Sequence, residues 1–299
     1  MRNSILLRTA LLGLSVVVLW PLTQSPAGQK SAAESWNQPF KPFRIIGNIY
    51  YVGTNNLACY LITTPAGYIL LDTALEESAP ILRANIATLG FKLNSIRIIL
   101  SSHAHFDHVA GHAEMKRATG AVVYATAADA AILESGGTKG FHPLTPYKPV
   151  KVDRIIKDGE VVRYGDVELT AHLTPGHTEG NTTWTTTVEE GGKKYDVVFV
   201  GSMSINPGVH LVNFQAWPDI AEVYARSFQI LRSLHCDVFL GPHAPFFEME
   251  AKVQRMSAQG KANPFIDPEG YRNYIASFEK SYNEQLQRER AHKQPYRER

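Results

Sequence analysis

The segment SSHAHFDHVAGH, which begins at residue 101, holds four histidines and one aspartate. Imidazole nitrogen and carboxylate oxygen are ligand atoms that zinc binds in proteins. A polar surface loop is the alternative interpretation, but ionisable groups packed this closely are costly unless a cation binds among them. We therefore predict a metal site with four candidate ligands in this segment: His103, His105, Asp107 and His108.

The spacing of these side chains favours two metal ions over one. His103 and His105 can point the same way, because alternate residues of an extended chain share a face. Asp107 and His108 follow where the chain turns toward a helix. A single ion cannot comfortably accept all four ligands across such short links, so two adjacent ions are expected.

Two further histidines are candidate ligands because each follows an apolar, strand-like run. His177 lies in TPGHTEGN and His243 lies in LGPHAP. A lone loop histidine is more often a surface residue, but three histidine loops at strand ends can converge on one edge of a sheet. His112, four residues after His108, is expected beside the site or on the surface. The other histidines are interpreted as structural or exposed: His142, His172, His210, His235 and His292.

The elements around these loops indicate a mixed α/β fold. IRIILS, just before the histidine segment, reads as a strand buried on both faces. CYLITTPAGYILLDT reads as a hairpin with its turn at Pro65-Ala66-Gly67. Helices are expected at 75–89, 111–119 and 219–234, with a long final helix opening at Asp267-Pro268. Strands, a helix and a histidine loop occur twice, and no linker separates the halves, so residues 28–299 are predicted to form a single domain.

Residues 1–27 have the layout of a cleaved secretory signal peptide. Arg2 and Arg8 flank the start, an apolar run ends at Pro21, and small residues precede a cleavage point after Ala27. The apolar run is too short for a transmembrane anchor. We predict a periplasmic protein with no membrane anchor after cleavage.

The net charge of the chain argues against nucleic acid as a partner. Without its two N-terminal arginines the chain has equal numbers of basic and acidic residues, so no overall field would attract nucleic acid.

Cys59 and Cys236 are the two cysteines. An exported protein could pair them, but two buried thiols are at least as consistent with their strand-like surroundings.

HAHFDH, with the later PGHT and GPH, resembles the metallo-β-lactamase superfamily, and the resemblance covers nearly all of residues 28–299. It implies an αββα four-layer sandwich, in which two sheets face each other and helices lie outside. It also implies that Asp72, in ILLDT, is a structural acid below the metal loop.

Within that superfamily, Ser202 is the informative position. Hydrolases of thioesters, lactones and RNA typically carry a metal-bridging aspartate here, at the end of a later strand, whereas this chain reads VVFVGSMS. Two subclasses of class B β-lactamases have cysteine, and the third has serine with a histidine on the second zinc. The chain is most similar to that third subclass, and Ala110-Gly111, where a glycine pair is common, is a minor departure.

The resemblance implies zinc-dependent hydrolysis of the β-lactam amide bond, and hence antibiotic resistance. Two zinc ions per chain would supply a metal-bound hydroxide, which Asp107 orients, and Ser202 and Ser204 would contact the substrate carboxylate. We expect a monomer acting on small-molecule β-lactams. The implied zinc ligands are, for the first ion, His103, His105 and His177, and for the second, Asp107, His108 and His243.

Two alternatives stay open. One is a lactonase or another hydrolase of the same fold, against which the serine at 202 argues. The other is a non-catalytic zinc-binding protein of the envelope, against which the complete ligand set and the lack of a long His-rich tract argue.

Overall fold

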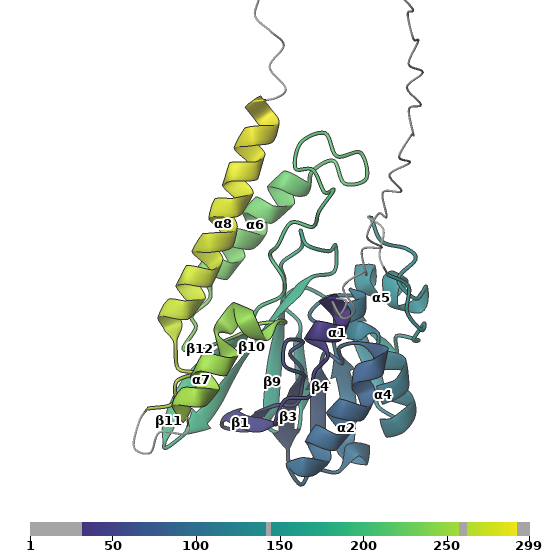
Figure 1. The fold of residues 1–299 in the computed structure, drawn as a ribbon, viewed down its shortest axis with the longest axis vertical. Coiled ribbons are helices and arrows are strands. Elements are labelled where there is room, and N and C mark those ends of the chain that lie inside the picture. The colour runs from purple at the N-terminus through teal and green to yellow at the C-terminus, as the bar shows by residue number, and fades with distance from the viewer. Residues whose placement is uncertain (1–31, 142–144, 257–261, 292–299) are drawn as a thin grey trace, which may run out of the picture.

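The computed structural model describes residues 32–141, 145–256 and 262–291. Two β-sheets form its centre, and helices lie on the outer sides of both (Figure 1). The first sheet has seven strands in sequence order. They are β1 (Phe43–Ile46), β2 (Ile49–Tyr51), β3 (Tyr60–Thr64), β4 (Gly67–Leu71), β5 (Ile96–Leu100), β6 (Val122–Thr126) and β7 (Arg154–Ile156).

The second sheet has five strands, in the order β12-β11-β10-β9-β8. Its β8, β9, β10 and β11 pair antiparallel, while β12 pairs parallel to β11. The strands are β8 (Val161–Tyr164), β9 (Val167–Leu173), β10 (Thr182–Glu190), β11 (Lys193–Phe199) and β12 (Val238–Leu240).

Alternation along the strands divides the core into two parts. In β4, Ile69 and Leu71 pack between the two sheets, whereas Leu70 packs under the helices on the other face. In β5, Leu100 packs between the two sheets and Ile99 packs under the helices. Successive side chains of a strand point to opposite faces, so both faces of this sheet are covered where Ile69 to Leu71 and Ile98 to Leu100 lie.

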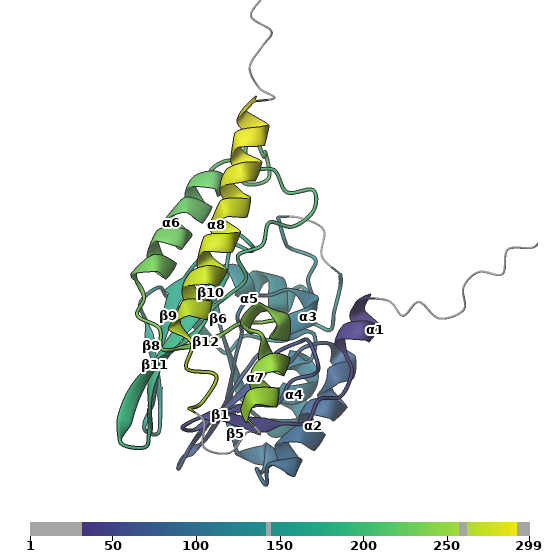
Figure 2. The ribbon, with the colours of Figure 1, turned by 60° about the vertical axis from the view of Figure 1, so that its left-hand side comes forward.

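The helices complete the four layers. In Figure 1 α2 and α4 cover the first sheet, while α6 and α8 lie beyond the second; α6 and α8 run side by side in Figure 2 as well. The predicted αββα sandwich is therefore confirmed. The helices are α1 (Ala32–Trp36), α2 (Ala79–Thr88), α3 (Phe106–Val109), α4 (His112–Thr119), α5 (Ala127–Glu134), α6 (Ile220–Ser233), α7 (Met249–Met256) and α8 (Pro268–Ala291), with 3-10 turns η1 (Glu76–Ser78), η2 (Leu93–Ser95) and η3 (Ala244–Phe247).

The helix predictions hold, with shifts at their ends. The helix expected from residue 75 begins as η1 and becomes α2 at Ala79, with Pro80 in its first turn, where a missing N–H costs nothing. Gly120 ends α4 in the left-handed conformation at φ 72° and donates to the Lys116 carbonyl. The short helices α1, α3, α5 and α7 were not expected.

Two other expectations concern export and the cysteines. Cys59 and Cys236 are both buried with free thiols. The predicted signal peptide, residues 1–27, lies outside the described residues, as do His142 and His292. Within the described ranges, no helix has the length and apolar character to cross a membrane.

Candidate metal centre

Three strand ends bring the histidine loops together. Residues 103–108 follow β5, His177 follows β9, and His243 follows β12. Two neighbouring groups result, each with ligand atoms within 4.8 Å of one another. This convergence is what the positions after apolar strands predicted.

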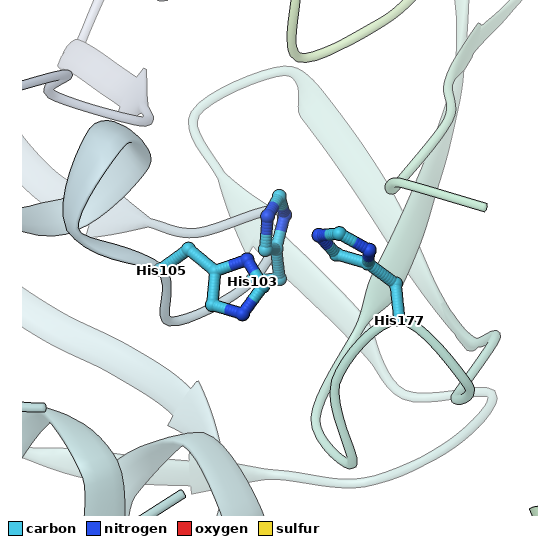
Figure 3. Close-up of side chains that lie close together, drawn as sticks. All are labelled: His103, His105 and His177. Carbon is cyan, nitrogen blue, oxygen red and sulfur yellow. The ribbon is translucent and has the colours of Figure 1, made fainter. Parts of the chain in front are cut away.

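The first group consists of His103, His105 and His177, all buried. Their ring centroids lie 4.6 to 4.8 Å apart. Figure 3 shows the three imidazoles gathered around one point, His103 and His105 from one loop and His177 from another. Three nitrogen donors around a point form the protein part of a tetrahedral zinc site.

The second group consists of Asp107, His108 and His243. Asp107 Oδ2 lies 3.3 Å from His108 Nε2 and 3.5 Å from His243 Nε2. Asp107 and His108 sit in the single turn of α3, which begins directly after His105. The two groups therefore adjoin, with the His103 and His108 ring centroids 4.3 Å apart.

Neighbouring oxygens determine which nitrogen of each histidine faces the site. His177 Nδ1 lies 2.7 Å from the Ser204 carbonyl oxygen, and His243 Nδ1 lies 2.8 Å from Asn56 Oδ1. These acceptors require a proton on Nδ1, so Nε2 keeps its lone pair for a metal.

Asp72 orients His103 through Ser102. The Asp72 carboxylate accepts from the Ser102 amide and from the Ser102 hydroxyl, both at 2.7 Å. Because that hydroxyl donates to Asp72, its lone pair can accept from His103 Nδ1, 3.1 Å away. Burial raises the pKa of Asp72 to about 6. Asp72 thus has the position under the metal loop that the family resemblance implied.

The donor set fits divalent zinc. His103 Nε2 is buried and has no hydrogen-bond partner among the described residues, as expected of an atom whose partner is a metal. Burial and the neighbouring His108 hold the pKa of His103 well below its usual value, so this imidazole is neutral. Burial would raise the pKa of Asp107, but the surrounding histidines, His108 first, hold it below its usual value, so the carboxylate is ionised.

His112 is a buried structural residue. Its Nδ1 lies 2.7 Å from Thr73 Oγ1 and its Nε2 lies 2.9 Å from Ser101 Oγ. Gly111 allows this packing, because a Cβ at this position would lie 2.5 Å from the Thr73 carbonyl oxygen. His112 belongs to neither ligand group.

The burial of His112 predicts a pH effect on stability. Burial lowers its pKa from 6.5 to about 3, so its contribution to folding is complete above pH 6.5 and is lost as pH falls toward 3. Each pH unit in that window is worth about 1.4 kcal/mol. Urea unfolding of zinc-free protein at pH 7 and pH 4 should show a smaller acid loss in His112→Gln than in the unmodified chain. Equal losses would contradict this assignment.

A cavity of about 540 Å³ opens over both ligand groups. Ser202 and Ser204, the predicted substrate-contacting residues, both line it, and their hydroxyl oxygens lie 3.2 Å apart. Ser204 also contacts His177 through its hydroxyl and its carbonyl oxygen. Aromatic side chains complete the wall: Trp36, Phe106 and Phe246.

Comparison with known proteins identifies the family. The model of the metallo-β-lactamase superfamily matches residues 52–243, a span that contains all six predicted ligands. The chain belongs to the metallo-β-lactamase superfamily. A metallo-β-lactamase from Legionella gormanii has a similar structure, with 44% identity, 84% of this chain and 97% of that chain covered, and a TM-score of 0.82. A subclass B3 metallo-β-lactamase from Bradyrhizobium japonicum gives 39% identity, 88% and 100% coverage, and a TM-score of 0.81.

The curated relatives that match this chain are named hydroxyacylglutathione hydrolases rather than β-lactamases. The chain is 38% identical over 107 residues to a hydroxyacylglutathione hydrolase from Cereibacter sphaeroides, a match that covers 36% of this chain. It spans only 34% of the length of that relative. A hydroxyacylglutathione hydrolase from Methylobacterium matches over 74% of its length at 28% identity. The superfamily is therefore shown, and the substrate must be argued from the site.

The structure also shows residues that the sequence patterns did not indicate. Asn56, which contacts His243, lies in a stretch without any metal-site signature. His235, interpreted as structural or exposed, forms a third His/Asp group with Asp196 and Asp237. His235 is exposed and the two aspartates are half-buried, and His235 Nδ1 lies at hydrogen-bond distance, 2.8 Å, from Asp196 Oδ2.

Proposed function

We propose that this protein is a zinc-dependent hydrolase of β-lactam antibiotics, with two zinc ions held by the two ligand groups. The observation that carries the proposal is the composition of those groups. Asp107 is their one carboxylate among the described residues. The segment that follows β11 contributes Ser202 to the cavity wall, at the position where the family resemblance implies a bridging aspartate in thioester and lactone hydrolases. Ser202 is accordingly no metal ligand.

The extent of the similarity supports the same proposal. Both β-lactamase structures match this chain over almost their whole length. The likeness to the hydroxyacylglutathione hydrolases is either restricted to about a third of their length or lower in identity. A shared HxHxDH segment is expected across the superfamily, whereas matches over 84% and 88% of this chain extend well beyond that segment.

The chemistry is hydrolysis of the ring amide. When bound, the zinc ions supply Lewis acidity, which polarises the carbonyl and lowers the pKa of water. Water contributes its hydroxyl to the carbonyl carbon, the C–N bond breaks, and the ring nitrogen gains a proton. The Asp107 carboxylate stays ionised at neutral pH because the surrounding histidines hold its pKa low, so it would orient a water O–H rather than retain the proton.

The remaining cavity residues bind and orient the substrate. The Trp36 ring packs edge-on against the His243 ring, with a centroid distance of 5.8 Å. The Phe246 ring is tilted against the His243 ring, with a centroid distance of 5.0 Å. These apolar walls exclude water and so strengthen the electrostatic interactions at the site. We assign the Ser202 and Ser204 hydroxyls to the substrate carboxylate, directly or through water.

Replacement of Ser202 with alanine should raise KM several-fold while kcat changes less and both zinc ions stay bound. The lost contact is one charge-assisted hydrogen bond, worth about 1–3 kcal/mol. Loss of binding common to ground and transition states appears in KM. Steady-state kinetics with elemental analysis measure both quantities. If the variant loses one zinc ion, Ser202 is a ligand and the assignment is wrong.

Activity on a panel of penicillins, cephalosporins and carbapenems, with and without a chelator, tests the proposed reaction. Chelator-sensitive hydrolysis supports it. A hydrolase of hydroxyacylglutathione thioesters is the second candidate, since the curated relatives are named hydroxyacylglutathione hydrolases. A protein that binds zinc but hydrolyses neither β-lactams nor thioesters would be a non-catalytic zinc-binding protein.

We also propose export to the periplasm as a single domain of residues 28–299. The support is the arrangement of Arg2, Arg8 and the small residues before Ala27. Mass spectrometry of protein from the native host should find an N-terminus near Gly28. Soluble protein that retains Met1 would contradict export.

A further inference from the structure

Ala104 separates the two histidines that the first ligand group takes from one loop, and both of its main-chain polar groups bind residues outside that loop. Its amide N–H lies against the carboxyl group of Asp129, whose pKa is raised by burial and lowered by this contact. Its carbonyl oxygen accepts from the Tyr147 hydroxyl at 3.0 Å. Ala104 is fully buried, so neither bond can be replaced by bulk water.

Asp129 also reaches the segment that carries the third histidine of the group. A Cβ at Gly180, three residues after His177, would lie 2.1 Å from Asp129 Oδ1 and 2.5 Å from Thr126 Oγ1. The carboxylate therefore packs directly on the 177–180 turn. Asp129 is 2% exposed, and its Oδ1 has no hydrogen-bond partner in the described part of the chain.

Asp129 lies in α5, and Tyr147 packs on the turn that follows this helix. Thr126 caps this helix by accepting from the Asp129 amide at 3.2 Å. Beyond the other end of α5, the Gly136 carbonyl accepts from the Tyr147 amide at 3.0 Å. A Cβ at Gly137 would lie 2.9 Å from the Tyr147 ring. The helix α5 and the turn after it thus support the two side chains that contact the Ala104 peptide.

We propose that Asp129 and Tyr147 are positioning residues, which fix the Ala104 peptide and so set the geometry of His103 and His105 toward the first zinc ion. This inference rests on the ligand assignment of the proposed function. Rotation of the Ala104 peptide would move both flanking side chains, and metal ligands must be held within about 0.5 Å of their working positions. In the second group, Asp107 and His108 lie further along the chain in α3 and do not adjoin this peptide.

The experiment measures zinc affinity in competition with a chromophoric chelator, together with the visible spectrum of cobalt-substituted protein. Tyr147→Phe removes only the hydroxyl, and Asp129→Ala removes the acceptor. Each should weaken the first group about 10- to 100-fold, the usual effect of losing a residue that orients a ligand, and should shift the cobalt bands. The second group should keep its affinity. His177→Ala and His243→Ala proteins, each lacking one ligand, assign the two binding steps.

Rescue and geometric variants separate positioning from general destabilisation. Asp129→Asn keeps an oxygen that accepts from the Ala104 amide, and burial already raises the pKa of Asp129 to about 8, so the neutral amide should restore most of the affinity. Gly180→Ala forces a methyl group against Asp129 and should weaken the first group without removing any polar atom. If Asp129→Ala fails to fold, Tyr147→Phe and Gly180→Ala still provide the test.

Tyr271→Phe is the matched control. The Tyr271 hydroxyl donates to a main-chain carbonyl, that of Leu231, at 2.6 Å in the core away from the site. Its loss should lower stability and leave both zinc affinities unchanged. If Tyr147→Phe and Asp129→Ala behave in the same way as this control, the positioning role is refuted. If the unmodified protein binds fewer than two zinc ions, the proposed function fails instead, and the two failures are distinguishable.

Discussion

Asp107→Ala should lose the zinc ion of the second group and nearly all turnover. Asp107 Oδ2 lies within 3.5 Å of both histidines of that group, so its removal leaves two neutral donors for a divalent cation. The variant also loses the acceptor that orients the attacking water. We expect kcat to fall on the order of a thousandfold, as when one preorganised electrostatic group is removed from a reacting centre.

Elemental analysis and steady-state kinetics on the same preparation measure this result. Asp107→Asn is the matched comparison, because it keeps the shape and an acceptor oxygen but removes the charge. It should retain more zinc than the alanine variant and remain strongly impaired. Two zinc ions with near-normal kcat in Asp107→Ala would show that this carboxylate is neither ligand nor orienting group.

Removal of zinc should abolish turnover and lower stability together. The protein brings His103, His105 and His177 together in a buried site, a clustering that is favourable mainly when a cation binds. A ligand bound only by the folded state at a thousand times its Kd contributes about 4 kcal/mol. The chelated protein should therefore unfold at a distinctly lower temperature, and two equivalents of zinc should restore both its Tm and its activity.

The stoichiometry is the decisive part of that experiment. His235→Ala removes the exposed third group and should leave the zinc content at two per chain. A firm value of one, with full activity, would remove the two-ion account. Activity that survives complete metal removal would contradict metal-dependent hydrolysis altogether.

The sequence predicted the parts of the site that have a local pattern. His103, His105, Asp107 and His108 occur in one short segment, and the apolar strands before His177 and His243 indicate where those loops must emerge. The sandwich fold followed from the family resemblance, and helix ends followed from local signals such as Gly120 and Pro268.

The supporting residues could not be predicted in this way. Asn56, Asp129 and Tyr147 act through single contacts to residues far away in the chain, and such contacts leave no periodicity or spacing. His112 shows the same limit. Its place after His108 allowed a surface position as well as one beside the site, and only the packing of Thr73 and Ser101 around it shows that it is buried.

The most direct test of the proposed function is the ratio of two kcat/KM values on one zinc-loaded preparation, for a β-lactam and for a hydroxyacylglutathione thioester. The cavity has Ser202 and His243 in its wall, and Asp107 is the one carboxylate of the two proposed ligand groups among the described residues. We therefore predict that β-lactam hydrolysis is the faster reaction and that a chelator abolishes it. Faster hydrolysis of the thioester, with little or no action on any β-lactam, would contradict the proposal and assign the protein to the thioester hydrolases of its superfamily.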